Sequence, residues 1–231
     1  MNKKQLINVF QDTVKRFDDI PTNSVTTKHS FDEIRMTLDG RTPNVSVINS
    51  DTVSAATLYS KLGKTCILNM ASWKHPGGGV ERGAQAQEEC LFRCSNLFEI
   101  PNYLYPLKSD EGIYTKDAVF IKDKFYQPMS PITVDVVTIS AINLKSNHKP
   151  EDYEKTMIKK ILLMMSLAKD NGCDNIILGA WGCGVYDNDP TTVAKMFRDY
   201  GTGDFDNIIY AVINDHNSVG SNYEIFKEVI C

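Results

Sequence analysis

Two adjacent carboxylates, Glu88 and Glu89, follow three consecutive glycines, residues 77–79, at the start of a predicted helix. A carboxyl group can donate a proton to a leaving group and accept one from water, so the pair is a candidate for acid–base catalysis. Adjacent residues of a helix point about 100° apart, and only one of the two can face a substrate. That one carboxylate would then act first as acid and later as base. The alternative is a solvated helix face after a flexible loop.

The glycine triplet follows Pro76 and joins this helix to an apolar run, residues 66–68, which is typical of a buried strand. Residues without a Cβ can take positive φ and let a ligand approach the backbone closely. Three in a row leave peptide groups that can bind a bulky or anionic group such as a sugar or a phosphate. We therefore predict that the triplet contributes to a binding site.

A second glycine-rich segment, residues 182–186, follows a buried strand predicted at 175–178. Its successive N–H groups can bind a diphosphate, and a helix predicted from Asp189 adds its positive end. Tyr186 is placed to pack on a ribose or a base, although an ordinary turn with an aromatic residue at its edge is the alternative. Ligands of parallel α/β sheets bind outside the carboxyl ends of the strands, so we predict that both loops line one cleft.

Strands and helices alternate along the chain. The predicted strands are 45–48, 65–70, 118–121, 134–141, 175–178 and 207–213, and the predicted helices are 3–18, 51–63, 84–98, 150–170, 189–200 and 222–229. Residues 31–38 are predicted as a short strand or a helical turn, and residues 99–117, with Tyr103, Tyr105 and Tyr114, as an irregular segment over the site. Because no hairpin signal is visible, the sheet should be largely parallel with helices on both faces.

Length and charge limit the possible functions. A chain of 231 residues suits one domain, predicted as 1–231 with residues 1–42 as a helical extension packed on it. The net charge of −4, without a basic stripe, argues against direct binding of nucleic acid. Neither a signal peptide nor a membrane span is visible, which predicts a cytoplasmic or otherwise intracellular protein with no membrane partner.

The six cysteines include no Cys-x-x-Cys pair. Cys90 and Cys94 are four residues apart on one face of a predicted helix, and we interpret them as core residues of a protein in a reducing compartment. Cys183 lies in the second glycine-rich segment but has no base at a recognisable spacing. It is therefore not predicted as a nucleophile.

Both loops resemble those of a known family. Three glycines, a short spacer and Gln-Glu-Glu at 87–89 resemble the catalytic loop of the bacterial-type poly(ADP-ribose) glycohydrolases, a branch of the macrodomain superfamily. Residues 179–186 (Gly-Ala-Trp-Gly-Cys-Gly-Val-Tyr) resemble the family's diphosphate loop, whose last aromatic residue lies over the bound nucleotide. Residues 134–143 and 47–52 are similar to two of the family's strands with their following segments.

The resemblance implies a macrodomain-like three-layer α/β/α sandwich with a mixed, mostly parallel sheet. It implies hydrolysis of ribose–ribose O-glycosidic bonds of poly(ADP-ribose), from chain ends, with release of ADP-ribose. Glu89 would be the acid and base, Glu88 would hold the ribose or the leaving group, and Gln87 would support the loop or the ligand. The implied substrate-binding residues are Asn69, Gly77, Gly78, Gly79, Val80, Gln87, Gly182, Cys183, Gly184, Val185 and Tyr186. No metal or cofactor is required, because the diphosphate's own charge favours an oxocarbenium-like ribose.

Several alternatives stay open at this point. Residues 72–75 (Ser-Trp-Lys-His) depart from the small residues of the family, and Trp73 could crowd or stack on the distal ribose. Asn69 could cap a turn instead of contacting a ribose. The expected partner is poly(ADP-ribose) or an ADP-ribosylated protein, and the expected state is a monomer. Rival functions are an ADP-ribose reader without turnover, which would not need the carboxylates, and a mono-ADP-ribosyl hydrolase.

Overall fold

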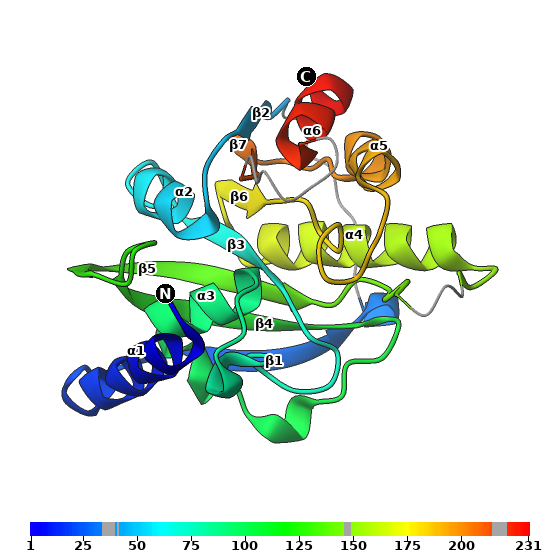
Figure 1. The fold of residues 1–231 in the computed structure, drawn as a ribbon. Coiled ribbons are helices and arrows are strands. Elements are labelled where there is room, and N and C mark those ends of the chain that lie inside the picture. Colours follow the sequence, from blue (N-terminus) through cyan, green and yellow to red (C-terminus); the bar gives the residue numbers. More distant parts are fainter. Residues whose placement is uncertain (34–39, 41, 146–148, 214–220) are drawn as a thin grey trace.

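A seven-stranded sheet forms the centre of the computed structural model, in the order β1-β4-β5-β3-β6-β7-β2, from bottom to top in Figure 1. The structure describes residues 1–33, 40, 42–145, 149–213 and 221–231. The strands are β1 (Val25–Ser30), β2 (Asn44–Ile48), β3 (Thr65–Met70), β4 (Glu111–Lys122), β5 (Pro128–Ile139), β6 (Asn175–Leu178) and β7 (Asn207–Ala211). The helices are α1 (Lys3–Arg16), α2 (Thr52–Tyr59), α3 (Gln87–Cys94), α4 (Tyr153–Asp170), α5 (Pro190–Tyr200) and α6 (Asn222–Ile230).

The sheet is mixed and mostly parallel, as predicted. Strands β5, β3, β6, β7 and β2 run parallel, whereas β4 is antiparallel to both β5 and β1. β3 lies between β5 and β6 and is buried along nearly its whole length, which explains its apolar sequence. Because β3 and β6 are parallel neighbours, the loops that follow them begin at the same edge of the sheet.

Helices cover both faces of the sheet and complete a three-layer sandwich (Figure 1). Helices α4, α5 and α6 share one hydrophobic cluster, and α2 and α3 share the other. Successive residues of β3 point to opposite faces, so Leu68 belongs to the first cluster and Ile67 to the second. Helix α1 packs against α3 at the side of this second layer. The macrodomain-like architecture expected from the resemblance is confirmed.

Two strands differ from the prediction. β1 belongs to the segment that was predicted as a helical extension, but it pairs with β4 as an edge strand. Its sequence, Val-Thr-Thr-Lys-His-Ser, has no apolar run because both of its faces are partly exposed. β4 and β5 form a long antiparallel hairpin, although no hairpin signal is visible in the sequence and β5 contains Pro128 and Pro131. Prolines are tolerated there because the first half of β5 is largely exposed and pairs only with β4.

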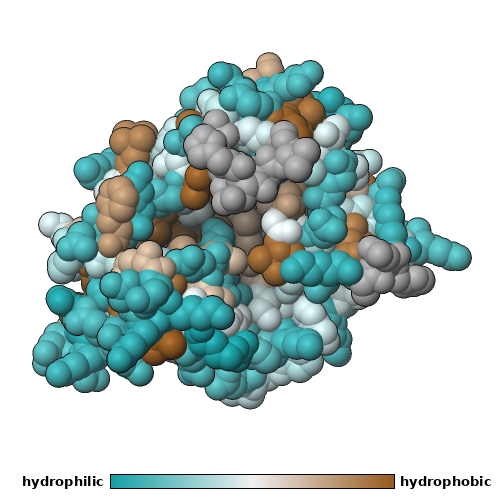
Figure 2. All heavy atoms as spheres, viewed as in Figure 1, coloured by the Kyte–Doolittle hydropathy of each residue, from teal (hydrophilic) through white to brown (hydrophobic). Residues whose placement is uncertain are grey.

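Other predicted segments are shorter or placed differently. Tyr114 was predicted in the irregular segment over the site, yet it is buried in β4. Of the segment 31–38, Phe31–Glu33 forms a short 3-10 helix and residues 34–38 lie outside the described residues. Within the described part of the chain, no helix has both the length and the apolar character that a membrane span requires. Figure 2 shows a largely hydrophilic face, with hydrophobic residues in small separate groups.

Candidate active site

The two glutamates lie in the first turn of α3 and are almost completely buried, at 3% exposed for Glu88 and 7% for Glu89. Glu88 accepts hydrogen bonds from the backbone N–H of Ser72 at 2.7 Å and of Gly77 at 3.1 Å. Glu89 accepts from the N–H of Gly79 at 2.9 Å and of Ala86 at 2.8 Å. The alternative of a solvated helix face is therefore wrong.

The glycine triplet surrounds these carboxylates. Its outer amides, at Gly77 and Gly79, donate to the glutamates instead of remaining free for a ligand, and Gly78 N–H donates weakly to the His75 carbonyl at 3.4 Å. Gly78 has φ +54°, and a Cβ there would lie 2.7 Å from Oε1 of Glu89. The prediction that these amides bind an anionic ligand is thus wrong for the described state. The triplet makes room for two carboxylates and holds them by their oxygens.

Burial raises the pKa of Glu88 to about 8, which exceeds the opposing effects of the Ser72 and Gly77 amides and the Asn69 side chain. The charge of the adjacent Glu89 adds to the increase, because two like charges in one buried site disfavour ionisation. Glu88 is therefore mostly protonated near neutral pH and can donate a hydrogen bond.

This pKa predicts that the free energy of unfolding falls as pH rises from about 4.5 to about 8. Within that window the folded protein keeps the proton that the unfolded chain releases. Each pH unit therefore lowers the free energy of unfolding by up to about 1.4 kcal/mol. Urea titrations measure the free energy of unfolding at each pH. Between about pH 5.5 and about pH 7.5, we expect this free energy to fall by about 2 kcal/mol less in Glu88→Gln than in the wild type. The same slope in both proteins would contradict the raised pKa.

The side-chain amide of Gln87 holds the start of α3 in place through hydrogen bonds. Its Oε1 accepts from the N–H of Met70 at 2.9 Å, and its Nε2 donates to the carbonyl of Leu68 at 2.6 Å and to the Thr52 hydroxyl at 3.2 Å. Both ends of the amide are thus used to attach α3 to the end of β3. Val80 is buried in the core, and its N–H donates to the Gly77 carbonyl. The contacts of Gln87 agree with its predicted support of the loop, whereas substrate binding by Gln87 and Val80 stays a prediction.

Asn69 lies at the end of β3 and is completely buried. Its Nδ2 donates to the hydroxyl of Thr138 at 3.3 Å, and its amide also interacts with Glu88. Its Oδ1 is buried and has no hydrogen-bond partner among the described residues. A buried acceptor without a donor is costly, so this oxygen is available to a ligand hydroxyl. The position does not support the alternative of a simple turn cap.

The backbone amides of the second loop, residues 182–186, differ in their partners from those of the glycine triplet. Gly182 has φ +77°, and a Cβ there would meet the Cβ of Ala141 at 2.6 Å, so the turn needs glycine. Asn188 holds the loop from inside by donating to the carbonyls of Gly182 and Tyr186. Among the described residues, none accepts a hydrogen bond from the N–H of Gly184, Val185 or Tyr186. Within the described part of the chain these successive amides are therefore available to an anion, and the binding of a diphosphate there stays a prediction.

The side chain of Tyr186 joins the two loops. Burial raises its pKa, the backbone of Trp73 and the side chain of Ser72 interact with its hydroxyl, and the charges of both glutamates add to the increase. These contacts bring the end of the second loop to the segment that donates to Glu88. Both loops therefore begin at one edge of the sheet and meet there, and the cleft between them stays a prediction.

Cys183 forms a weak contact from its Sγ to the carbonyl of Trp181 at 3.6 Å. Burial raises the pKa of its thiol, so the thiolate needed for nucleophilic attack is disfavoured. Within the described part of the chain, His, Cys, Asp and Glu side chains do not gather in any group of three that could hold a metal ion.

One residue of the site was not singled out by the sequence. Tyr105 has a buried hydroxyl without a hydrogen-bond partner among the described residues. Burial raises its pKa, and Glu88 and Tyr186 add to the increase, which places the hydroxyl near both of them. The concentration of tyrosines in the segment over the site was the available signal, but it did not distinguish Tyr105 from the exposed Tyr103.

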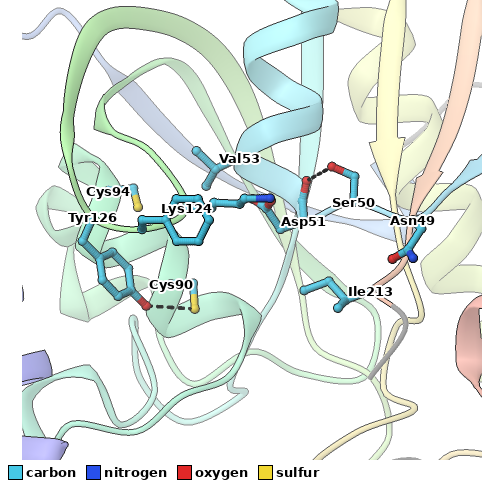
Figure 3. Close-up of a pocket in the computed structure, with 10 residues that line it drawn as sticks. Asn49, Ser50, Asp51, Val53, Cys90, Cys94, Lys124, Tyr126 and Ile213 are labelled. Carbon is cyan, nitrogen blue, oxygen red and sulfur yellow. Dashed lines mark hydrogen bonds and ion pairs between the residues drawn. The ribbon is translucent and has the colours of Figure 1, made fainter. Parts of the chain in front are cut away.

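A pocket of about 320 Å³ lies beside α3, which contributes Cys90 and Cys94 to its lining (Figure 3). It is lined by Asn49, Ser50, Asp51, Val53, Cys90, Cys94, Lys124, Phe125, Tyr126 and Ile213. Asp51 caps α2 by accepting from the N–H of Ser54, and Lys124 lies 4.0 Å from its other carboxylate oxygen. The Tyr126 hydroxyl contacts Cys90 at 3.2 Å. The sequence analysis did not predict this pocket.

The family model of the microbial-type poly(ADP-ribose) glycohydrolase (PARG) catalytic domain matches residues 11–123. This match covers just under half of the chain, and that part of the chain is similar to the microbial-type PARG family. The matched segment contains the glycine triplet and Gln87, Glu88 and Glu89, but it ends before the second loop. Among proteins with curated functions, none matches the chain in sequence.

Solved structures extend the similarity beyond the matched segment. PARG from Thermomonospora curvata is 23% identical, with a TM-score of 0.86 over 98% of this chain and 99% of that one. The same protein bound to the inhibitor ADP-HPD is 24% identical, with a TM-score of 0.85 over 97% and 99%. PARG from Deinococcus radiodurans in complex with ADP-ribose is 26% identical, with a TM-score of 0.80 over 89% and 94%. The PARG fold therefore includes both loops of this chain.

Proposed function

We propose that this protein hydrolyses ribose–ribose O-glycosidic bonds of poly(ADP-ribose) from chain ends and releases ADP-ribose. The observation that carries the proposal is the placement of the buried pair Glu88 and Glu89 beside a loop with three free N–H groups, residues 184–186. The free amides suit the diphosphate, and the acidic pair suits the ribose at its end. The related structures from Deinococcus radiodurans and Thermomonospora curvata hold ADP-ribose and the inhibitor ADP-HPD, respectively.

Glu89 is the proposed acid and base. Its carboxyl group gives a proton to the leaving ribose oxygen as the bond from the anomeric carbon to that oxygen breaks. The resulting carboxylate accepts a proton from water, and the water oxygen forms the new bond to the same carbon. The amides of Gly79 and Ala86 hold both carboxyl oxygens, so the side chain keeps one orientation through both steps.

Glu88 has a different proposed role. Its raised pKa keeps it mostly protonated at neutral pH, so it can donate to a ribose oxygen while Asn69 Oδ1 accepts from a ribose hydroxyl. Tyr186, whose hydroxyl contacts Ser72 and Trp73, packs against the sugar or the base. We also propose that residues 1–231 act as one domain and as a monomer, with poly(ADP-ribose) or an ADP-ribosylated protein as partner and without direct binding of nucleic acid.

The proposal is tested by incubating the protein separately with poly(ADP-ribose) and with mono-ADP-ribosylated protein, and measuring released ADP-ribose by chromatography. We expect release from the polymer at a rate at least about 10²-fold above that of a protein without both carboxylates. Release from the mono-ADP-ribosylated protein alone would select a mono-ADP-ribosyl hydrolase. Binding of ADP-ribose without release from either substrate would select a reader and contradict the proposal.

A further inference from the structure

We propose that Trp73 and Lys74 form a second nucleotide subsite, which binds the ADP-ribose unit on the leaving-group side of the scissile bond. The inference rests on the proposed function, because that unit exists only when the substrate is a polymer. It concerns the segment 72–75, Ser-Trp-Lys-His, which precedes the glycine triplet.

The backbone of Trp73 is held beside the acidic pair. The preceding N–H, at Ser72, donates to Glu88 at 2.7 Å. The carbonyl of Trp73 accepts from the N–H of Leu107 at 2.8 Å, and its backbone also interacts with the Tyr186 hydroxyl. Three separate segments therefore fix the position of this one residue at the edge of the site.

The indole of Trp73 is nevertheless 42% exposed. The chain's other tryptophan, Trp181, shows the contrasting arrangement, since it is fully buried and donates its Nε1 to the carbonyl of Ile139 at 3.0 Å. Lys74 places its ammonium group 5.3 Å from the centre of the Trp73 ring. An exposed aromatic ring and a cation thus lie together, one residue from a contact of Glu88.

This pair matches the chemistry of the leaving group in a polymer. The leaving unit carries a purine base, which stacks on an aromatic ring, and a diphosphate, which a lysine attracts. The chain as a whole is acidic, with a net charge of −4, so a cation at this edge is a local feature and not part of a general basic surface. A protein side chain as leaving group has neither base nor diphosphate. The subsite therefore favours polymer over mono-ADP-ribosylated protein.

The test compares Trp73→Ala and Trp73→Phe with the wild type in kcat/KM for ADP-ribose release from poly(ADP-ribose), and in Kd for free ADP-ribose by calorimetry. Because one lost base stack typically weakens binding by about tenfold or more, we expect Trp73→Ala to lower kcat/KM about tenfold. Phenylalanine should keep most of the activity, and the Kd for ADP-ribose should change by less than about twofold, because ADP-ribose has no leaving unit. Tyr200→Ala is the matched control, since Tyr200 is 41% exposed at the far end of α5.

Lys74→Ala supplies a second variant that removes no packed side chain. It should lower kcat/KM on the polymer a few-fold at low salt, with a smaller effect at high salt. Unchanged kcat/KM on the polymer in Trp73→Ala and Lys74→Ala would overturn the subsite, and so would an equal loss of ADP-ribose affinity. A wild-type protein that releases no ADP-ribose from the polymer would instead overturn the proposed function itself, together with this subsite.

Discussion

Glu89→Gln is expected to lower kcat for ADP-ribose release by about 10³-fold, the loss typical of a missing general acid and base. The amide cannot give a proton to the leaving oxygen or accept one from water. It also offers only one acceptor to the N–H groups of Gly79 and Ala86, where the carboxylate offers two. We therefore expect a small loss of stability, of about 1 kcal/mol, in addition to the loss of turnover.

Glu88→Gln is the matched control for that variant. Glu88 likewise accepts from two backbone amides, at Ser72 and Gly77, so the substitution creates the same mismatch in the same loop. We expect it to lower kcat only about tenfold, because a side-chain amide can still donate a hydrogen bond to the ribose. If Glu88→Gln lost more turnover than Glu89→Gln in single-turnover measurements, the protonated Glu88 would be the acid, and the assignment of roles would be wrong.

Gly78→Ala is expected to lower kcat/KM by at least about 100-fold, because displacements of about 1 Å among reacting groups have effects of this size. The added Cβ would lie 2.7 Å from Oε1 of Glu89 and 3.0 Å from Oε2 of Glu88. Either the loop or both carboxylates must move, and the hydrogen bonds from Gly77 and Gly79 move with them.

Gly172→Ala separates this contact from backbone strain. Gly172 has φ +71°, close to the +54° of Gly78, but a Cβ there meets no atom within 4 Å. Both variants should lose about 1–2 kcal/mol of stability from the left-handed backbone, measured by urea unfolding. Only Gly78→Ala should lose activity. Equal activity in the two variants would show that the glycine at 78 is needed for its backbone alone.

Secondary structure could be predicted where a segment is stabilised mainly by its own residues and by burial on both faces. β3 was predicted at the residues it occupies, because a strand buried on both faces is mostly apolar, as Cys66, Ile67 and Leu68 are here. The start of α2 near Asp51 was predictable because the Asp51 carboxylate accepts from the N–H of Ser54, only three residues along the chain. β1 was missed, since a polar edge strand has no pattern of its own and forms only when β4 is present to pair with it.

The candidate site, too, could be predicted from the sequence only in part. The residue types of the acidic pair and of both glycine-rich segments were visible along the chain and predicted one cleft at the edge of the sheet. The hydrogen-bond acceptors of the backbone amides in the two loops could not be predicted from the sequence. The N–H groups of Gly77 and Gly79 donate to Glu88 and Glu89, whereas those of residues 184–186 have no acceptor among the described residues, although both loops contain several glycines. The sequence shows where glycines leave backbone amides uncovered by a side chain. It does not show which of these amides donate to a side chain of the folded protein.

By itself the sequence determined the alternation of strands and helices, the acidic pair and the turns that require glycine, because each depends on residues within a few positions of one another. Only the tertiary structure decided that Tyr186 reaches the segment at Trp73, that Leu107 holds the same segment, and that burial protonates Glu88. These contacts join residues far apart in the chain. Their energies come from desolvation and close approach, which do not exist until the sheet brings the loops together.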